Sequence, residues 1–501
     1  MTVARTTAPA ARLGLPTKLL YAVGATASNL KLRALSTFLL IFYNQVVGLP
    51  AKTVGAILMI ALVLDAILDP LVGQLSDNFH SRWGRRHPFM LASALPFAAS
   101  FFLLWSPPGG WSEQATAGYL LATLLSVRFF DTFFELPHQA LAPELAKDYD
   151  DRTTLLSLRH LFMVIGGLGM TVLAYQVFLR ERADGSGGVL ARDGYFAYSL
   201  AGGLIIFATI VITTLGTASQ IPKLRQAPTR RATLKVTLSE MAQTLNNRAF
   251  IVATLAGMFI AVAIGARNGL EIYFGLYFWQ LKQSELATLA TISVIGSFAG
   301  VALAPIIGRV MGKKFGAIAV FATAVVIHIT PVSLRLLGLA PPNGSPELLV
   351  LIYGEEIFNS AFAAATGVLL ASIIADVVED AEVKTGRRSE GLLLSSGNLF
   401  RKMVSGVGVL IATSVLAFIE FPVGAKRDAV NPEILRSLGL AYIPTVLVLY
   451  SIAIGWLFAF NITRARHEEN LRTLSATALA AEIGVEAEPE GGVVAPSSPL
   501  R

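Results

Sequence analysis

Two carboxylates stand one helical turn apart inside an apolar stretch of the sequence. Asp65 and Asp69 lie in Leu62-Val-Leu-Asp-Ala-Ile-Leu-Asp-Pro70, and this i,i+4 spacing places both on one face of a helix. Because two close carboxylates repel each other unless a cation or a proton lies between them, the pair predicts a site for Na⁺ or H⁺. A salt bridge to a basic residue on another helix is the alternative. Charges inside membrane-spanning segments are functional by default, and this favours the ion site.

A second group of charges follows in another apolar segment. Arg128 and Asp131 are three residues apart and could simply neutralise each other. Glu135 lies one turn further on, just before Pro137, and a proline lets a helix bend around a cavity. We therefore expect Glu135 to contact a ligand or the cation rather than to form only a buried pair. His138 could relay a proton, but a packing role is at least as well supported.

Basic residues within apolar segments complete this set. Arg401 and Lys402 lie in one such segment, and a buried lysine needs an anionic partner, which Asp65 or Asp69 would supply. One of the two basic groups could instead extend to the membrane surface. Arg159 either reaches the same cavity or extends in the same way.

The second half of the sequence has its own charges at membrane depth, including Glu355 and Glu356. Arg267 and Glu271 are four residues apart, and a functional site and a structural pair are equally supported. The aromatic run 273–279 could stack on a sugar, but anchoring at the lipid interface is favoured.

These residues require a membrane-embedded, all-α framework. Of 501 residues, 54% are hydrophobic and only 15% are charged, against about 25% in ordinary soluble domains. A span needs about 20 apolar residues. Twelve candidate spans recur, at Leu19–Val47, Thr53–Leu75, Pro88–Trp105, Ala115–Leu145, Leu155–Val177, Tyr195–Gly216, Phe250–Trp279, Glu285–Ile307, Ala317–Leu337, Leu348–Val378, Gly391–Phe418 and Ile434–Phe460.

The positive charges between these segments predict the orientation. With both termini in the cytoplasm, the inside loops carry roughly twice as many Lys and Arg as the outside loops. This distribution accounts for the net charge of +7 without nucleic acid as a partner. Residues 1–17 have no apolar core, so no cleavable signal is expected.

The longest inside loop divides the chain into two sets of six spans. A weak repeat supports two related halves, because Gly73–Arg86 after the second span has an echo in Gly308–Lys314 after the eighth. Within the loop, Leu234–Leu245 predicts an amphipathic helix on the membrane surface. The predicted organisation is a cytoplasmic tail 1–17, a six-helix bundle 18–217, a central loop 218–248, a second bundle 249–463 and a disordered cytoplasmic tail 464–501.

The chain resembles the glycoside–pentoside–hexuronide:cation symporters of the major facilitator superfamily. The resemblance extends to about Phe460 and rests on motifs that occur in the family's order. They are Tyr21-Ala-Val-Gly24, Phe42-Tyr-Asn-Gln-Val-Val-Gly48, Asp65-Ala-Ile-Leu-Asp69-Pro-Leu-Val-Gly73, Ser81-Arg-Trp-Gly-Arg85-Arg-His-Pro88, Leu136-Pro-His-Gln-Ala-Leu-Ala-Pro143 and Asp376-Val-Val-Glu-Asp-Ala-Glu382 with Arg388-Ser-Glu390. The resemblance implies twelve transmembrane helices in two pseudo-symmetric six-helix bundles.

The resemblance also implies a role for several residues. Asp65 and Asp69 match the family's cation-site carboxylates, and Thr132 matches a hydroxyl close to them. Glu135 matches an acid that binds sugar hydroxyls beside the cation. Arg159 matches an arginine at the sugar. Lys402 matches the family's basic residue that interacts with the cation-site carboxylates.

Three positions depart from the melibiose-permease pattern. The helix-one aspartate that holds sugar hydroxyls falls on Asn29, whose amide bonds a sugar more weakly than a carboxylate does. Gln139 occupies the position of the aromatic residue that follows the helix-four acid, so the usual aromatic platform is missing. Leu68 replaces a polar residue beside Asp69 and offers no oxygen to Na⁺, which favours H⁺ slightly.

Together these features predict a cation-coupled symporter of a sugar or glycoside that works by alternating access. A basic loop would gate the cytoplasmic side through Arg82, Arg85 and Arg86, with Asp77 as one partner. The alternatives are a cation-coupled carrier of a lysolipid or other amphiphile and, more remotely, a non-transporting receptor. With no cysteine and no metal-ligand spacing, we expect no enzyme activity, no cofactor and no metal beyond a possible Na⁺ at the Asp65/Asp69 pair. The partners expected are the small-molecule substrate, the coupling cation and the lipid bilayer.

Overall fold

The computed structural model describes residues 13–460 except 147, 183–186, 225–247, 386–403, 405 and 428, and beyond 460 only the isolated positions 469 and 473. Most of these residues are helical, and their only β-structure is one isolated bridge between Glu181 and Gly187. The all-α prediction is therefore confirmed. The predicted helix 234–245 and the basic pair Arg401 and Lys402 lie outside the described residues.

The first half contains six spanning units. The first unit is interrupted, and a short 3₁₀ segment follows the sixth. The elements are α1 (Leu15–Ala22), α2 (Ala25–Ala34), η1 (Leu35–Leu39), η2 (Phe42–Val46), α3 (Ala51–Asn78), α4 (His87–Leu104), α5 (Glu113–Leu145), α6 (Tyr149–Leu173), η3 (Ala174–Phe178), α7 (Asp193–Thr217) and η4 (Ala218–Lys223).

The second half follows the same plan. Its elements are α9 (Arg248–Tyr273), η5 (Phe274–Phe278), α10 (Gln283–Met311), α11 (Lys313–Leu336), α12 (Pro346–Thr385), an apolar helix Gly406–Phe418 and α14 (Pro432–Phe458). Ten helices of the described chain are long and apolar enough to cross a membrane. The interrupted unit from α2 to η2 and the shorter helix Gly406–Phe418 bring the total to the twelve predicted.

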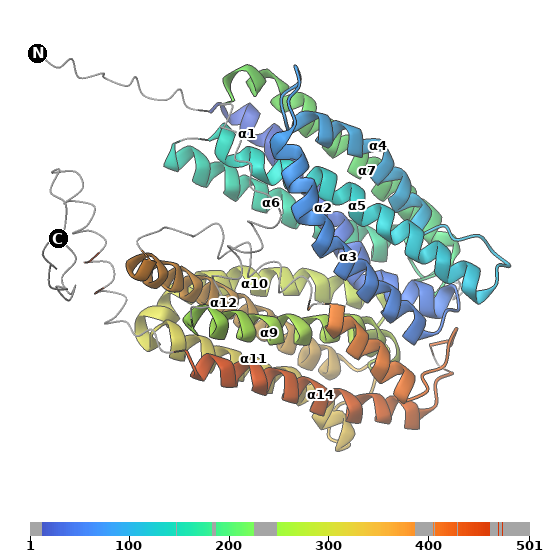
Figure 1. The fold of residues 1–501 in the computed structure, drawn as a ribbon. Coiled ribbons are helices and arrows are strands. Elements are labelled where there is room, and N and C mark those ends of the chain that lie inside the picture. The colour runs from blue at the N-terminus through green and yellow to red at the C-terminus, as the bar shows by residue number, and fades with distance from the viewer. Residues whose placement is uncertain are drawn as a thin grey trace, which may run out of the picture.

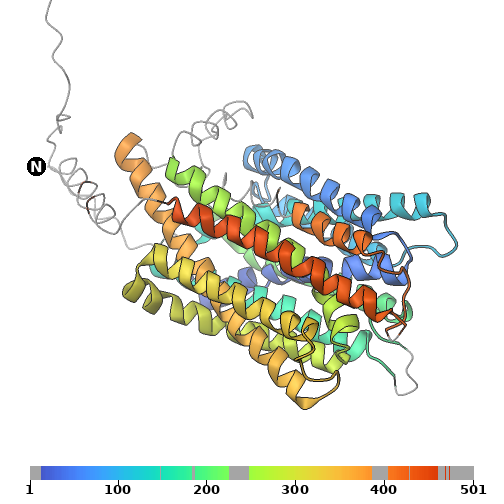
Figure 2. The same cartoon turned by 90° about the horizontal axis from the view of Figure 1, so that it is seen from below.

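The two halves repeat the same helix pairings. In the first half α3 packs on α5, α4 on α5 and α4 on α7; in the second half α10 packs on α12, α11 on α12 and α11 on α14. Figure 1 shows the halves as two separate bundles, and Figure 2 shows the helices of the second bundle running side by side. The boundaries of the predicted domains remain predictions.

The repeat extends to individual hydrogen bonds. Each half's first span ends in a π-helical segment, η2 or η5. Val47 N–H donates to Phe42 O at 2.9 Å, and Trp279 N–H donates to Phe274 O at 2.8 Å. The next residue has positive φ in both halves: Gly48 at 96° and, less commonly for a side chain of this type, Gln280 at 52°.

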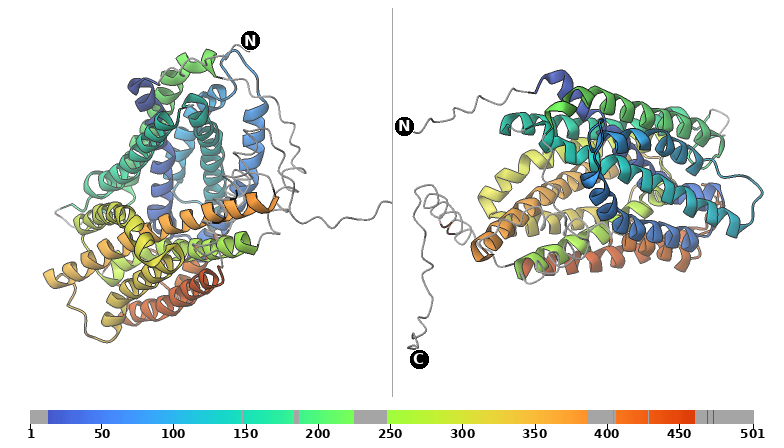
Figure 3. Two further views of the ribbon diagram at one scale, coloured as in Figure 1. Left: turned by 90° about the vertical axis from the view of Figure 1, so that its left-hand side faces the viewer. Right: turned by 45° about the horizontal axis from the view of Figure 1, so that its top comes forward.

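The two halves meet at the end of the molecule that carries η2 and η5, which we call the Asn44 end. Tyr273 Oη donates to Asn44 Oδ1 at 2.7 Å. Gln45 Nε2 donates to Pro422 O at 3.1 Å, and Gln45 Oε1 accepts from Ala425 N–H at 2.9 Å. Figure 1 shows the two sets of helices diverging away from this contact, and Figure 3 shows the two bundles from one end. The opposite end, where α3 ends and α4 begins, is called the Glu144 end.

Candidate ion and substrate sites

The predicted ion-site carboxylates lie together between α3 and α5. The hydroxyl of Thr132 is 3.2 Å from Asp65 Oδ1 and 3.0 Å from Asp69 Oδ1. A hydroxyl has a single proton and cannot donate to two carboxylates at once. The arrangement therefore suits one additional proton or cation shared among these oxygens. Of the four predicted cation-site residues, Glu135 makes its hydrogen bonds elsewhere, with side chains described below.

An arginine contacts one of these carboxylates, so the salt bridge that was the alternative to an ion site is present. Arg128 Nη1 donates to Asp65 Oδ2 at 3.0 Å, and both side chains are buried. The suggested neutralisation of Arg128 by Asp131 is wrong, because Asp131 pairs with Lys31 of α2 at 2.5 Å. Lys31 was not among the predicted site residues. A lysine inside an apolar segment is the signal that would have found it.

The predicted substrate residues Glu135, Gln139 and Arg159 form a second cluster on α5 and α6. Arg159 Nη2 donates to Glu135 Oε1 at 2.7 Å, and Gln139 Nε2 donates to the same oxygen at 2.5 Å. Within the described chain, Glu135 Oε2 and Arg159 Nε are buried and have no hydrogen-bond partner. Asn29 of α2 donates instead to Met163 O at 2.5 Å. The fifth predicted substrate residue, Lys402, lies outside the described residues.

His138 is a packing residue. Its ring stacks on Tyr21, with ring centroids 4.4 Å apart, and on Phe134, with centroids 5.1 Å apart. Its Nε2 lies 2.9 Å from the carbonyl oxygen of Tyr21. Because the ring is fully buried between aromatic side chains, the geometry favours the packing interpretation over the proton relay.

The arginines of the basic loop at the Glu144 end pair with an acidic residue that was not among the predicted site residues. Arg85 and Arg86 both contact Glu144 Oε1 of α5, with Arg86 Nη2 at 2.7 Å. Asp77 lies 3.3 Å from Arg86 but is more than half exposed, and Arg82 is exposed. Glu144 is therefore the main acidic partner. Its position directly after the Leu136–Pro143 motif was the sequence feature that could have identified it.

The second half repeats this contact between corresponding helices. Lys313, at the start of α11, lies 2.6 Å from Asp376 of α12. The pair occupies the same position in its bundle as Arg86, directly before α4, and Glu144 of α5. The sequence echo after the eighth span thus marks an ion pair rather than an unpartnered basic loop.

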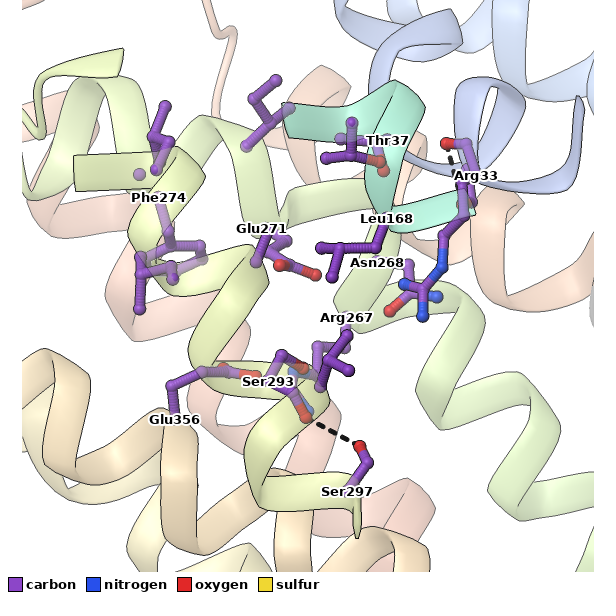
Figure 4. Close-up of a pocket in the computed structure, with 18 of the residues that line it drawn as sticks. Arg33, Thr37, Leu168, Arg267, Asn268, Glu271, Phe274, Ser293, Ser297 and Glu356 are labelled. Atoms are coloured by element: carbon purple, nitrogen blue, oxygen red, sulfur yellow. Dashed lines mark hydrogen bonds and ion pairs between the residues drawn. The ribbon is translucent and has the colours of Figure 1, made fainter. Parts of the chain in front are cut away.

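A cavity of about 460 Å³ lies between the two halves. Its volume falls in the range of about 300–1,000 Å³ that is usual for small-molecule sites. Asn29, Arg33 and Thr37 line it from the first half, whereas Arg267 and Glu271 line it from α9 (Figure 4). The cluster of Glu135, Gln139 and Arg159 is not part of this lining.

Two expectations for the second half need correction. Arg267 does not pair with Glu271, because its guanidinium lies 3.1 Å from Glu356 of α12. The aromatic run 273–279 does not face lipid. Its side chains are buried, Tyr273 and Tyr277 bond across the Asn44 end, and Trp279 lines the cavity.

Solved structures of transporters share this architecture. The nucleoside transporter NupG is similar with a TM-score of 0.59 and 14% identity, covering 90% of this chain and 100% of that one. The inward-open xylose transporter XylE from E. coli gives a TM-score of 0.58 and 13% identity, covering 91% and 98%. The molecule thus has the fold of the major facilitator transporters, as predicted.

The sequence profile described as MFS/sugar transport protein matches residues 20–464, and the chain belongs to this family. Its relatives include the putative glycoside/cation symporter YagG of Escherichia coli (strain K12), 25% identical over 92% of this chain and 95% of the relative. The isoprimeverose transporter of Lactiplantibacillus pentosus is 23% identical over 87% of each chain. The predictions of a cation-coupled sugar symporter and of no enzyme activity are confirmed at the level of the family.

Proposed function

We propose that this protein couples the movement of a glycoside to that of a proton across the cytoplasmic membrane. The ion would bind at Asp65, Asp69 and Thr132, and Glu135 would link this site to the substrate. The observation that carries the proposal is the single Thr132 hydroxyl lying 3.0–3.2 Å from both carboxylates. That arrangement is satisfied when one proton or cation is shared among these oxygens.

The contact between Arg128 and Asp65 supports H⁺ over Na⁺. Na⁺ needs several oxygen ligands, whereas a proton needs one carboxylate. Asp65 Oδ2 already accepts from the guanidinium, and Leu68 supplies no oxygen beside Asp69. Fewer oxygens are therefore available to complete a metal-ion shell.

The substrate would bind where buried polar atoms lack partners. Glu135 Oε2 and Arg159 Nε, one acceptor and one donor, are such atoms in the described chain. An unsatisfied buried polar group costs about 1–3 kcal/mol, and sugar hydroxyls can satisfy both kinds. Gln139 would contribute from the same side and Asn29 from the wall of the cavity, and Lys402 is expected to contribute from its match to the family motif. The names of the relatives YagG and the isoprimeverose transporter support a glycoside as the substrate class.

We propose that both termini lie in the cytoplasm, so the Glu144 end faces the cytoplasm and the Asn44 end faces outward. The two bundles would then rock about the cavity, opening it to each side in turn. At the inner face, the contacts of Arg85 and Arg86 with Glu144 and the Lys313–Asp376 pair would rearrange as the bundles move.

Proteoliposomes containing the whole chain test the proposal. Uptake of isoprimeverose, lactose and a panel of other glycosides is measured under an H⁺ gradient, a Na⁺ gradient and no gradient. We expect H⁺-driven accumulation in the wild type and in Glu347→Gln, which removes an exposed carboxylate. The double variant Asp65→Asn, Asp69→Asn should lose accumulation but keep exchange without a gradient. If the double variant accumulates sugar like the wild type, the ion site is wrong; uptake of lysolipid in place of every glycoside would make the substrate class wrong.

A further inference from the structure

The second half carries a polar network that the proposed ion and sugar sites do not use. Four helices contribute titratable side chains to the cavity wall: Arg267 and Glu271 from α9, His328 from α11, Glu355 and Glu356 from α12, and Tyr442 from α14. In Figure 4, Arg267, Glu271 and Glu356 point toward the same space as Arg33 of the first half. Acidic groups at membrane depth are energetically costly and usually functional.

Three of these side chains form a continuous hydrogen-bonded chain. His328 Nδ1 lies 2.8 Å from Glu355 Oε1, and His328 Nε2 lies 2.6 Å from Tyr442 Oη. His328 and Glu355 are only 13% and 12% exposed, yet both line the cavity. Asn359 lies beside this chain, with its amide nitrogen 3.3 Å from His328 Nδ1.

This chain is hydrogen-bonded with or without one extra proton. In the neutral state, Nδ1–H donates to the Glu355 carboxylate and Nε2 accepts from the Tyr442 hydroxyl. When the imidazole is protonated, Nε2–H donates instead, and the tyrosine oxygen accepts, because a hydroxyl can do either. Both states keep the His328–Glu355 and His328–Tyr442 hydrogen bonds, so a proton can enter and leave without breaking either contact.

The wall of the second half carries more acidic than basic side chains, so a protonated His328 would have a counter-charge. Arg267 neutralises Glu356 at 3.1 Å, and no other Lys or Arg of the described second half lines the cavity. Glu355 and Glu271 are therefore in excess on this side. The polar side chains that α10 adds to the wall are Ser293 and Ser297, and both are uncharged. Tyr450 of α14 lies near Tyr442 and Arg267, and Arg33, His160 and Tyr175 line the cavity from the first half.

We propose that His328 and Glu355 share one exchangeable proton and form a second ion-binding site, in the half of the molecule opposite Asp65 and Asp69. Because the pair opens on the cavity between the bundles, the proton and the bound substrate raise each other's affinity by linkage. This last step rests on the proposed function. The proton site itself does not.

The site is tested without a substrate, on the full chain in lipid nanodiscs with ¹⁵N-labelled histidine. Nuclear magnetic resonance spectra report the tautomer and charge of each imidazole between about pH 5 and 9. We expect His328 to change from the Nδ1–H form to the doubly protonated form as the pH falls. In Glu355→Gln, which removes the counter-charge, it should bind the proton at least about tenfold more weakly.

Several variants make the result specific. His328→Gln identifies the signal by its loss, and if that variant does not fold, the shift in Glu355→Gln identifies it instead. His160→Gln removes a histidine on the same cavity and should leave the titration unchanged. Tyr442→Phe should weaken proton binding without abolishing it. A His328 signal that stays in one form throughout, or that titrates identically in Glu355→Gln, overturns the proposal.

Linkage to the substrate is tested in proteoliposomes with the glycoside accumulated by the wild type. Glu355→Gln should keep exchange without a gradient, but its H⁺-driven accumulation ratio should fall at least about tenfold. In Glu347→Gln the accumulation ratio should not fall. Unchanged accumulation in Glu355→Gln overturns the linkage. If no glycoside is transported at all, the proposed function fails, but the titration of His328 still decides the proton site.

Discussion

Arg128 would compete with the proposed coupling ion for Asp65. Arg128 lies 3.0 Å from the carboxylate with both side chains buried, so the guanidinium does what a coupling ion would do there. An incoming ion must therefore replace an existing contact rather than fill an empty one. This makes the affinity for the ion depend on how easily Arg128 moves, and that is open to measurement.

Arg128→Gln should destabilise the protein in a way that cations repair. Removing one partner of a buried ion pair typically costs about 3–5 kcal/mol, because the other charge is left uncompensated. We expect a marked fall of the unfolding temperature in Na⁺-free buffer at alkaline pH. Lowering the pH neutralises Asp65, so it should restore most of the loss, and Na⁺ or Li⁺ should also help.

Arg128→Lys is the control, since it keeps a positive charge near Asp65 and its unfolding temperature should fall much less. The combination Arg128→Gln with Asp65→Asn should also recover stability, because neither charge remains. A loss of stability in Arg128→Gln that is the same at every pH and in every salt would contradict a titratable ion site at Asp65.

Which of the predicted ion-site residues lie together could be predicted from the sequence, but the partners of the charged groups could not. Asp65, Asp69 and Thr132 do lie together, as their positions in the family motifs imply. Arg128 and Arg267, however, pair with other helices rather than with the acids three or four residues away. Spacing along one helix places side chains on a face, whereas the partner depends on which helix packs against that face.

At the scale of helices, glycines determine how closely the walls of the cavity approach. Gly166 of α6 faces α2, and a Cβ placed there would lie 2.8 Å from the Cα of Thr26. Asn29, one turn along α2, bonds to Met163 O of α6. The close approach of these two helices therefore fixes where Asn29 meets the cavity. The twelve spans were predictable from apolar length, but this contact distance was not, because it depends on side-chain absence on a particular face.

Gly166→Ala should destabilise the protein although alanine is the better helix former. Since the added methyl meets the backbone of Thr26 as well as its side chain, we expect a cost of about 1–3 kcal/mol from overpacking. Gly169 lies on the same helix, and a methyl group added there would meet nothing within 4 Å. Gly169→Ala should be neutral or stabilise by up to about 1 kcal/mol. Thermal unfolding of both variants separates packing from propensity, and equal stability would mean that α2 and α6 are not closely packed.

For the whole molecule, the contacts between halves at the Asn44 end keep that end closed. Tyr273 bonds to Asn44, and Gln45 bonds to Pro422 and Ala425. Each such hydrogen bond contributes about 0.5–1.5 kcal/mol, so a few together can set the ratio of the two open states. Because they join residues far apart in the sequence, they form only when the bundles come together.

The double variant Tyr273→Phe, Gln45→Ala should open this end more often. The chain has no cysteine, so a single Ser293→Cys in the cavity wall can be labelled without background. We expect a membrane-impermeant maleimide to label it at least about tenfold faster from the Asn44 end, because a loss of about 1.4 kcal/mol changes a population tenfold. Labelling from the Glu144 end should slow correspondingly, and vesicles of both orientations distinguish the two directions.

Tyr119→Phe provides the matched control for this experiment. The Tyr119 hydroxyl also bonds to backbone oxygens, those of Leu103 and Ser106, but these lie within the first half. Its loss should therefore change stability without favouring either open state, and the labelling rates should stay as in the parent. If the double variant and Tyr119→Phe label alike from both ends, the contacts of Asn44 and Gln45 do not hold the closed state.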